Sequence, residues 1–332
     1  MSIWRKQGGI IGKPDGNVYP SSGSWDVTER YTDENRAPAG EVLFSTVQSS
    51  YSWTVPGDTG GTIHIICVGG GGGGGASTSS NNGVSGGGGA GGGLHWINSV
   101  SVTSGETLLV TIGAAGTGGT AAGQNNSSAG GTSNVKRSTT ILAQATGGGA
   151  GSFNNSSYND YASGGVAGTG GGGGTGGPGR GGANGQGGSG GGGAAGYAGN
   201  GGRGAYYSTL PSNAPAGGGG GGGAAVNGFT GAITTGGGGV AVYGQGVSGL
   251  AAPSPNNPGS QTTTRGYQGS VVGGIASQTG TYGAGGTGSE DVSGAAGGNG
   301  NAGVVRIIWG AGRTFPSTNT DQASSSGNVT TI

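Results

Sequence analysis

The stretch "TIHIICVGGGGGGGA", residues 62–76, joins two different kinds of sequence. Its first half is an apolar run rich in isoleucine, which is typical of a β-strand. Its second half is a run of seven glycines, 69–75, and glycine has the most backbone entropy to lose on ordering and no side chain to bury. The reverse junction occurs near the other end, where "GGNGNAG" leads into "VVRIIWG", residues 304–310. The question is whether the glycine between these strands is a slack linker or a folded material.

The composition excludes several classes of protein. Of 332 residues, 95 are glycine and 7% are charged, against about 25% charged in ordinary domains, and the formal net charge is zero. Without a basic face we expect no nucleic-acid partner. One cysteine allows no intrachain disulfide, and no apolar run reaches the ~20 residues of a membrane span. The first residues lack an apolar signal core, so we expect synthesis in a cytoplasm without secretion by the usual route.

Short runs rich in Val, Ile, Thr and aromatic residues predict a β-domain. In "ETLLVTIG" the alternation places Leu108, Val110 and Ile112 on one face, and in the last run Val305, Ile307 and Trp309 share a face. We expect the last strand to pair with the early sheet, with "TIHIICV" as its partner. The predicted strand runs are 41–47, 51–58, 62–69, 94–103, 106–113, 134–146 and 304–310.

Three structures could accommodate the glycine. Collagen requires a strict Gly-X-Y period, which runs such as "GGGGGGGAA" break. A flexible linker of over 150 residues would be unusual, since loops in compact domains are short. The third structure is polyglycine-II, an extended helix with three residues per turn that gains stability when many copies pack and exchange backbone hydrogen bonds. We favour polyglycine-II over a disordered excursion.

The predicted fold class is therefore all-β plus polyglycine-II: a β-sandwich closed by a C-terminal strand, with an inserted glycine-rich bundle. We expect four parts: an N-terminal arm (1–40), a β-sandwich (41–146, completed by 303–310), a polyglycine-II domain (147–302) and a partly disordered C-terminal tail (311–332).

No pattern in the sequence predicts catalysis. No glycine run ends in the Gly-Lys-Ser/Thr of a phosphate-binding loop, and the glycines after Cys67 lead to no helix pattern. His64 and His95 lie in strand patterns, where a hydrogen-bonded structural role is the simpler interpretation. The adjacent Glu290 and Asp291 have the pattern of a solvated loop rather than an acid–base pair. We expect no enzyme activity, no cofactor and no metal site.

Three inserts concentrate the Tyr and Asn residues: 152–163, 197–215 and 253–269. Rigid aromatic side chains beside small polar ones are typical of recognition loops, and Tyr stacks on sugar rings. The alternative is that these residues only connect glycine helices and shield them from water. The candidate receptor-binding residues are Tyr158, Asn159, Tyr161, Tyr197, Arg203, Tyr206, Tyr207, Arg265 and Tyr267.

The complete pattern resembles the glycine-rich domain of bacteriophage tail and fibre proteins. The segments that carry the resemblance are "YSWTVPGD", "IICVGGGG", "SGETLLVTIG" and "VVRIIWG". The segment "KQGGIIGKP…SGSWDVTERY" resembles the leader of marine and cyanobacterial phage structural proteins, which implies virion attachment through anchor residues such as Trp4, Trp25 and Tyr31. The glycine region is similar to the polyglycine-II sandwich of distal adhesins on the long tail fibres of T-even-like phages.

The resemblance implies two alternative functions. In the first, the protein is a tail-fibre or tail-tip adhesin of the virion, bound to other tail proteins, whose loops contact a host glycan or outer-membrane protein. In the second, it is a structural spacer of a virion appendage and another protein recognises the host. A fibre implies a homotrimer, although no coiled-coil heptad supports one.

Overall fold

The computed structural model describes residues 39–76, 86–120, 126–152, 161–180, 190–204, 217–218, 236–249, 282–289, 296–317 and 329–331. The chain divides into two compact units, Met1–Ala37 and Pro38–Ile332, and the fold below is that of the second. Across the described ranges the regular structure consists of β-strands without helices, so none of these residues forms a helix long and apolar enough to cross a membrane. The expected attachment residues Trp4, Trp25 and Tyr31 lie outside the described residues.

Two main sheets organise this unit. The larger has the strand order β12-β1-β11-β3-β4-β9 and the smaller has the order β2-β5-β6-β7, while β8 and β10 form a separate pair. All pairings are antiparallel except that of β12 with β1. The strands are β1 (Gly40–Phe44), β2 (Tyr51–Thr54), β3 (Thr62–Val68), β4 (Leu94–Ser101), β5 (Thr107–Thr111), β6 (Ser133–Arg137), β7 (Thr140–Ala145), β8 (Tyr161–Ala162), β9 (Gly172–Gly174), β10 (Gly179–Arg180), β11 (Val304–Trp309) and β12 (Val329–Thr331).

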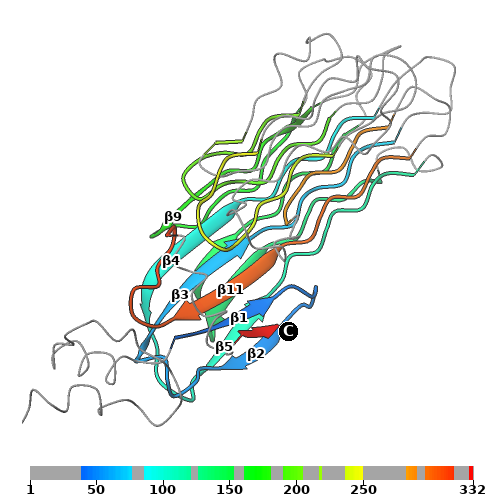
Figure 1. Cartoon of the computed structure of the whole chain (residues 1–332). Helices are drawn as coiled ribbons and strands as arrows, with labels where there is room; N and C mark the ends of the chain where they lie inside the picture. The colour runs from blue at the N-terminus through cyan, green and yellow to red at the C-terminus, as the bar shows by residue number, and fades with distance from the viewer. Residues whose placement is uncertain are drawn as a thin grey trace, which may run out of the picture. The chain divides into compact units, whose positions relative to one another are not determined.

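Strand β11 lies between β1 and β3, although more than 200 residues separate it from either in the chain (Figure 1). Ile307 pairs with Ile65 of β3 and with Val42 of β1. The expected partner of the last strand, "TIHIICV", is therefore confirmed. Because β3 and β11 flank the glycine region in sequence, their pairing fixes both ends of that region to the same sheet.

An apolar core fills the space between the two sheets. Leu108, Val110 and Ile112 of the smaller sheet face this core, as the alternation predicted. Val305, Ile307 and Trp309 enter it from the larger sheet, and the rings of Trp309 and Trp53 lie 6.0 Å apart between centroids. The period-two pattern thus identified the inward faces of both sheets correctly.

The opposite face of the larger sheet is buried as well. Ile66, Val68 and Ile308 pack against residues 194–197 and 240–242 of the glycine region and against Phe315. This second contact explains why β3 and β11 are apolar at almost every position instead of alternating. Of the expected tail 311–332, the structure describes 311–317 and 329–331: Phe315 and Arg313 are fully buried, and 329–331 pairs with β1.

The run 134–146, expected as one strand, is a hairpin. Strands β6 and β7 pair with Arg137 opposite Thr140, so that Ser138 and Thr139 form the turn. Ser138 has a φ of 53°, a left-handed conformation for which Asn or Gly is the usual signal. The Ser-Thr sequence carries no such signal, so the turn could not be recognised from the pattern.

The boundary expected at residue 146, between a β-domain and a glycine domain, does not divide the structure. Glycine-rich segments extend strands on both sides of that residue: 69–76 follows β3, 86–93 precedes β4, 113–119 follows β5 and 296–303 precedes β11. In Figure 1 the strands of the larger sheet continue into extended segments that run side by side. Strands and glycine-rich segments therefore alternate along the chain, and the glycine-rich segments continue from the ends of the strands.

Candidate functional site: the glycine lattice

Among the described residues, twelve extended segments form what we call the glycine lattice. They are 69–76, 86–93, 113–120, 126–131, 146–152, 163–168, 174–179, 190–196, 199–204, 236–240, 282–289 and 296–303. Their backbone amides donate mainly to carbonyls of other segments, at distances of 2.7–3.2 Å. The lattice is consequently held together by main-chain atoms rather than by side chains.

The hydrogen bonds of segment 69–75 repeat every third residue. Each amide donates to another segment, and residues three apart donate to the same one, so that successive amides point toward three different neighbours. The pairs, donor first, are Gly69 with Gly93, Gly70 with Gly131, Gly71 with Asn301, Gly72 with Ala90, Gly73 with Ser128, Gly74 with Gly298 and Gly75 with Gly87.

The carbonyls of the same segment accept from three further neighbours with the same period. The pairs, donor first, are Gly148 with Gly70, Gly116 with Gly71, Gly286 with Gly72, Gly151 with Gly73, Gly119 with Gly74 and Ser289 with Gly75. Donors and acceptors together join segment 69–75 to six surrounding segments. The three that accept from it run antiparallel to it, and the three that donate to it run parallel.

Segment 86–93 is enclosed in the same way. It is hydrogen-bonded to 69–75, 146–152, 163–168, 174–179, 190–196 and 282–289. Every residue of both central segments is buried, and Ala90 is the single residue other than glycine among positions 69–75 and 86–93. The seven-glycine run 69–75, and the segment 86–93 in which Ala90 alone interrupts the glycines, thus each have six neighbouring segments.

Close approach, rather than backbone conformation, requires glycine in these central segments. None of the residues from 69 to 75 has a φ in the left-handed region. A Cβ atom added at Gly72 would lie 2.0 Å from the carbonyl oxygen of Gly149, and one at Gly74 would lie 1.7 Å from that of Thr287. The Cα–H bond in this direction therefore points at a neighbouring carbonyl, as in the Cα–H···O contacts of packed backbones.

An outer segment has the same repeat on one side only. In 113–119, "GAAGTGG", the glycines at 113, 116 and 119 are buried, whereas Ala114 and Thr117 are exposed. One residue in three thus faces the central segment and is glycine, whereas Ala114, Ala115 and Thr117 between them carry side chains. The amount of glycine in a segment follows the number of segments around it.

Several segment ends lie at one level, far from the sheets. Gly75 accepts from Ser289 and donates to Gly87, and Gly87 donates to Ser152. The segments leave strands β3 and β7 at 69 and 146, so these bonded ends are the ones remote from the strands. They bound four stretches outside the described residues: 77–85, 121–125, 153–160 and 290–295.

Most of the predicted recognition residues lie outside the described part of the chain: Tyr158, Asn159, Tyr206, Tyr207, Arg265 and Tyr267. The same holds for Glu290 and Asp291. The backbone of Tyr161 lies in β8 opposite Arg180. Arg203 is exposed between buried Gly202 and Gly204 in an outer segment. Among the residues that the structure describes, these candidates are therefore not gathered into a set that could be described as a binding site.

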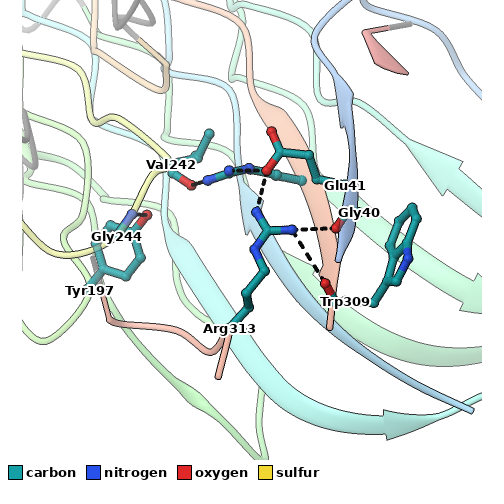
Figure 2. Close-up of polar contacts among 8 residues, drawn as sticks. Gly40, Glu41, Tyr197, Val242, Gly244, Trp309 and Arg313 are labelled. Atoms are coloured by element: carbon teal, nitrogen blue, oxygen red, sulfur yellow. Dashed lines mark hydrogen bonds and ion pairs between the residues drawn. The ribbon is translucent and has the colours of Figure 1, made fainter. Parts of the chain in front are cut away.

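The expectation that Tyr197 contacts a receptor is corrected by its burial. Tyr197 is 0% exposed, and its ring packs 6.3 Å from that of Phe315 between centroids. Its hydroxyl accepts from the amide of Gly244 at 3.0 Å (Figure 2). The same hydroxyl donates to the carbonyl of Ala241 at 3.3 Å. Tyr197 thus fastens the glycine region to the larger sheet and presents no surface to a ligand.

A buried ionic cluster, which the sequence analysis did not identify, lies on the same face. The carboxylate of Glu41 accepts from Arg306 at 2.5 Å and from Arg313. Arg313 also donates to the carbonyls of Gly40 and Trp309, as Figure 2 shows. Arg306 donates to the carbonyl of Val242 at 2.9 Å and lies over the Tyr243 ring. The cluster joins β1, β11, the 242–244 loop and the C-terminal segment. A charged residue within "VVRIIW" was the available signal.

The remaining reactive groups have structural surroundings. His64 lies in β3 and His95 in β4, and burial lowers the pKa of both imidazoles; the Arg313 charge lowers that of His64 further, and its hydrogen bond to Asn98 opposes the shift. Burial raises the pKa of the Cys67 thiol, which is fully enclosed in the core. Within the described ranges, no three His, Cys, Asp or Glu residues gather where they could hold a metal ion.

The comparisons with known proteins address the family of the chain. Comparison with curated proteins finds no match. The model of a family described as a glycine-rich domain matches residues 45–310, a range that begins just after β1 and ends just after β11 and therefore includes both main sheets and the lattice. Since this range is most of the chain, the protein belongs to the glycine-rich domain family.

Proposed function

We propose that the glycine lattice is a bundle of packed polyglycine-II helices and that it holds host-recognition loops at the tip of a bacteriophage tail or tail fibre. The three-residue repeat of the hydrogen bonds around segment 69–75 is the one that a helix with three residues per turn gives. The β-sandwich, closed by β11, would provide the base of this bundle.

One observation carries the functional part of the proposal: segments 69–75 and 86–93 are each enclosed by six others. Such enclosure makes a stiff body, and binding residues are commonly placed on loops that a rigid scaffold positions. Two of the stretches between the remote ends are rich in Asn and Ser, "STSSNNGVS" (77–85) and "FNNSSYND" (153–160), and the second also contains Tyr158. These compositions suit contact with a host glycan or an outer-membrane protein.

The resemblance to phage tail and fibre proteins supports the remaining elements of the proposal. Residues 1–40 would attach the protein to other tail proteins, and the virion would be its site of action. The proposed contacts are Arg203, on an outer segment, and the remaining candidates of the inserts: Tyr158, Asn159, Tyr161, Tyr206, Tyr207, Arg265 and Tyr267. The protein would act without catalysis.

The test is an adsorption assay with virions that carry Tyr158→Ala, Tyr161→Ala, Tyr206→Ala and Tyr207→Ala together. The proposal predicts particles of normal number and morphology that no longer adsorb to the host. Val247→Ala, at a side chain that is 71% exposed, is the control and should leave adsorption unchanged. Normal adsorption of the fourfold variant would reject the adhesin role and favour a structural spacer.

A further inference from the structure

Segment 113–120 forms an edge of the lattice. Among the described residues it has three neighbouring segments, 69–75, 126–131 and 296–303, instead of six. The amides of Gly116 and Gly119 point inward and donate to Gly71 and Gly74 at 2.8 Å. With a three-residue repeat, the amides of the intervening residues point away from the central segment.

Three of these outward amides donate to side chains. The amide of Thr117 donates to the hydroxyl of Ser128 at 2.8 Å, that of Gly118 to the amide oxygen of Asn299 at 2.7 Å, and that of Thr120 to the amide oxygen of Asn126 at 2.7 Å. Asn126 and Ser128 belong to one flanking segment and Asn299 to the other. In the central segments, amides of every direction donate to backbone carbonyls. At this edge, a side-chain oxygen therefore accepts the hydrogen bond that a backbone carbonyl of another segment accepts in the interior of the lattice.

The same arrangement recurs on two other outer segments. The amide of Val166 donates to the hydroxyl of Thr146 at 2.8 Å, and the amide of Thr175 donates to the amide oxygen of Asn200 at 3.0 Å. Asn, Ser and Thr satisfy the unpaired amides at helix N-termini with the same atoms. Here the amides lie along the side of a segment rather than at its end.

We propose that Asn126, Ser128 and Asn299 are edge caps that close this face of the lattice to a glycine segment from a second copy of the chain. A row of uncapped amides beside small side chains is a template for addition of another chain, as at the exposed edge of a β-sheet. The caps remove this template by occupying the donors and by adding bulk where a further backbone would lie. This role is independent of host recognition.

The first test compares two triple variants by amide hydrogen exchange resolved by NMR. Asn126→Gly, Ser128→Gly and Asn299→Gly remove the acceptors, whereas Asn126→Asp, Ser128→Thr and Asn299→Asp retain them. In the first variant the amides of Thr117, Gly118 and Thr120 should exchange about tenfold faster, the factor of one typical hydrogen bond, while those of Gly116 and Gly119 stay unchanged. The acceptor-retaining variant should match the wild type. Equal acceleration at the inward amides, or none at the outward ones, would overturn the assignment.

The second test is sedimentation velocity of the same proteins over a hundredfold range of concentration. The acceptor-removing variant should form species that sediment faster than the wild type, and the fraction of protein in these species should rise with concentration. The acceptor-retaining variant should sediment like the wild type. If the acceptor-removing variant sediments like the wild type at every concentration, the caps do not keep copies apart and the proposal fails.

Discussion

Residues 63–68 and 69–75 are consecutive in the chain and are all buried, but different atoms stabilise them. The first group transfers large apolar side chains out of water, and its backbone pairs with two neighbouring strands. The second group has no side chains, and its backbone contacts six neighbours. A buried position in the strand therefore needs a large side chain, because the space between the sheets must be filled. A buried position in the lattice has no room for a large side chain, because the backbones are in contact there.

The difference predicts that adding one carbon to the lattice is more harmful than removing three from the core. Gly72→Ala places a Cβ 2.0 Å from the carbonyl oxygen of Gly149, and backbone on both sides leaves no flexible atom to yield. We expect a loss of about 4 kcal/mol or more in the free energy of unfolding, measured by urea denaturation. Gly218→Ala is the control, because its nearest atom would be 3.5 Å away. Equal stabilities of the two variants would show that the segments can separate.

The matching change in the core is Ile65→Ala. Ile65 is fully buried between the sheets, so the substitution leaves a cavity and should cost about 3.5 kcal/mol in the same assay. Ile141→Ala, at a side chain that is 51% exposed, should cost less than ~1 kcal/mol. A loss at Ile65 that is no greater than the loss at Ile141 would contradict the assignment of the core.

The ionic cluster tests the junction between the two regions. Glu41→Gln leaves the buried Arg306 and Arg313 guanidinium groups without their carboxylate and should cost about 3 kcal/mol, measured by urea denaturation. Glu106 is paired with Arg137 at the surface, with side chains 21% and 42% exposed. Glu106→Gln should therefore cost less than ~1 kcal/mol. Similar effects at both sites would mean that Glu41 is not buried in solution.

A smaller effect is expected from pH. Burial lowers the pKa of His64 and His95, so the unfolded chain binds protons at these sites at a higher pH than the folded protein does. The stabilisation is complete above the ordinary histidine pKa of about 6.5 and is lost progressively as the pH falls below it. Urea denaturation at pH 7 and pH 5 should show this loss. The double variant His64→Gln, His95→Gln should show a smaller dependence on pH between these values.

The strands could be predicted because an apolar run and an alternating pattern are both local properties of the sequence. The run 62–68 and the pattern around Leu108 each contain the necessary information within seven residues. The pairing of β11 with β3 could be predicted because a strand at the far end of the glycine region needs a partner strand. The turn at Ser138 carried no glycine or asparagine, so it could not be predicted.

The centre of the lattice could not be located from the sequence in the same way. The expected glycine domain began at 147, yet the two enclosed segments lie at 69–75 and 86–93, inside the expected β-domain. Their neighbours come from positions such as Gly149, Gly286 and Asn301, and no local pattern specifies which segments meet. The length of a glycine run was an incomplete signal, because 69–75 is buried throughout whereas none of the five glycines at 170–174 is buried. Tyr197 was misassigned because an aromatic residue beside glycine looks the same in a loop and in a buried contact.

Native-state amide hydrogen exchange over residues 62–76 tests the central claim most directly. If the glycine run is folded and held by its backbone hydrogen bonds, the amides of 69–75 will exchange as slowly as those of β3, because both must wait for the same structure to open. If the amides of 69–75 exchange at the rate of an unfolded chain while β3 stays protected, the glycine is slack and the lattice does not exist in solution.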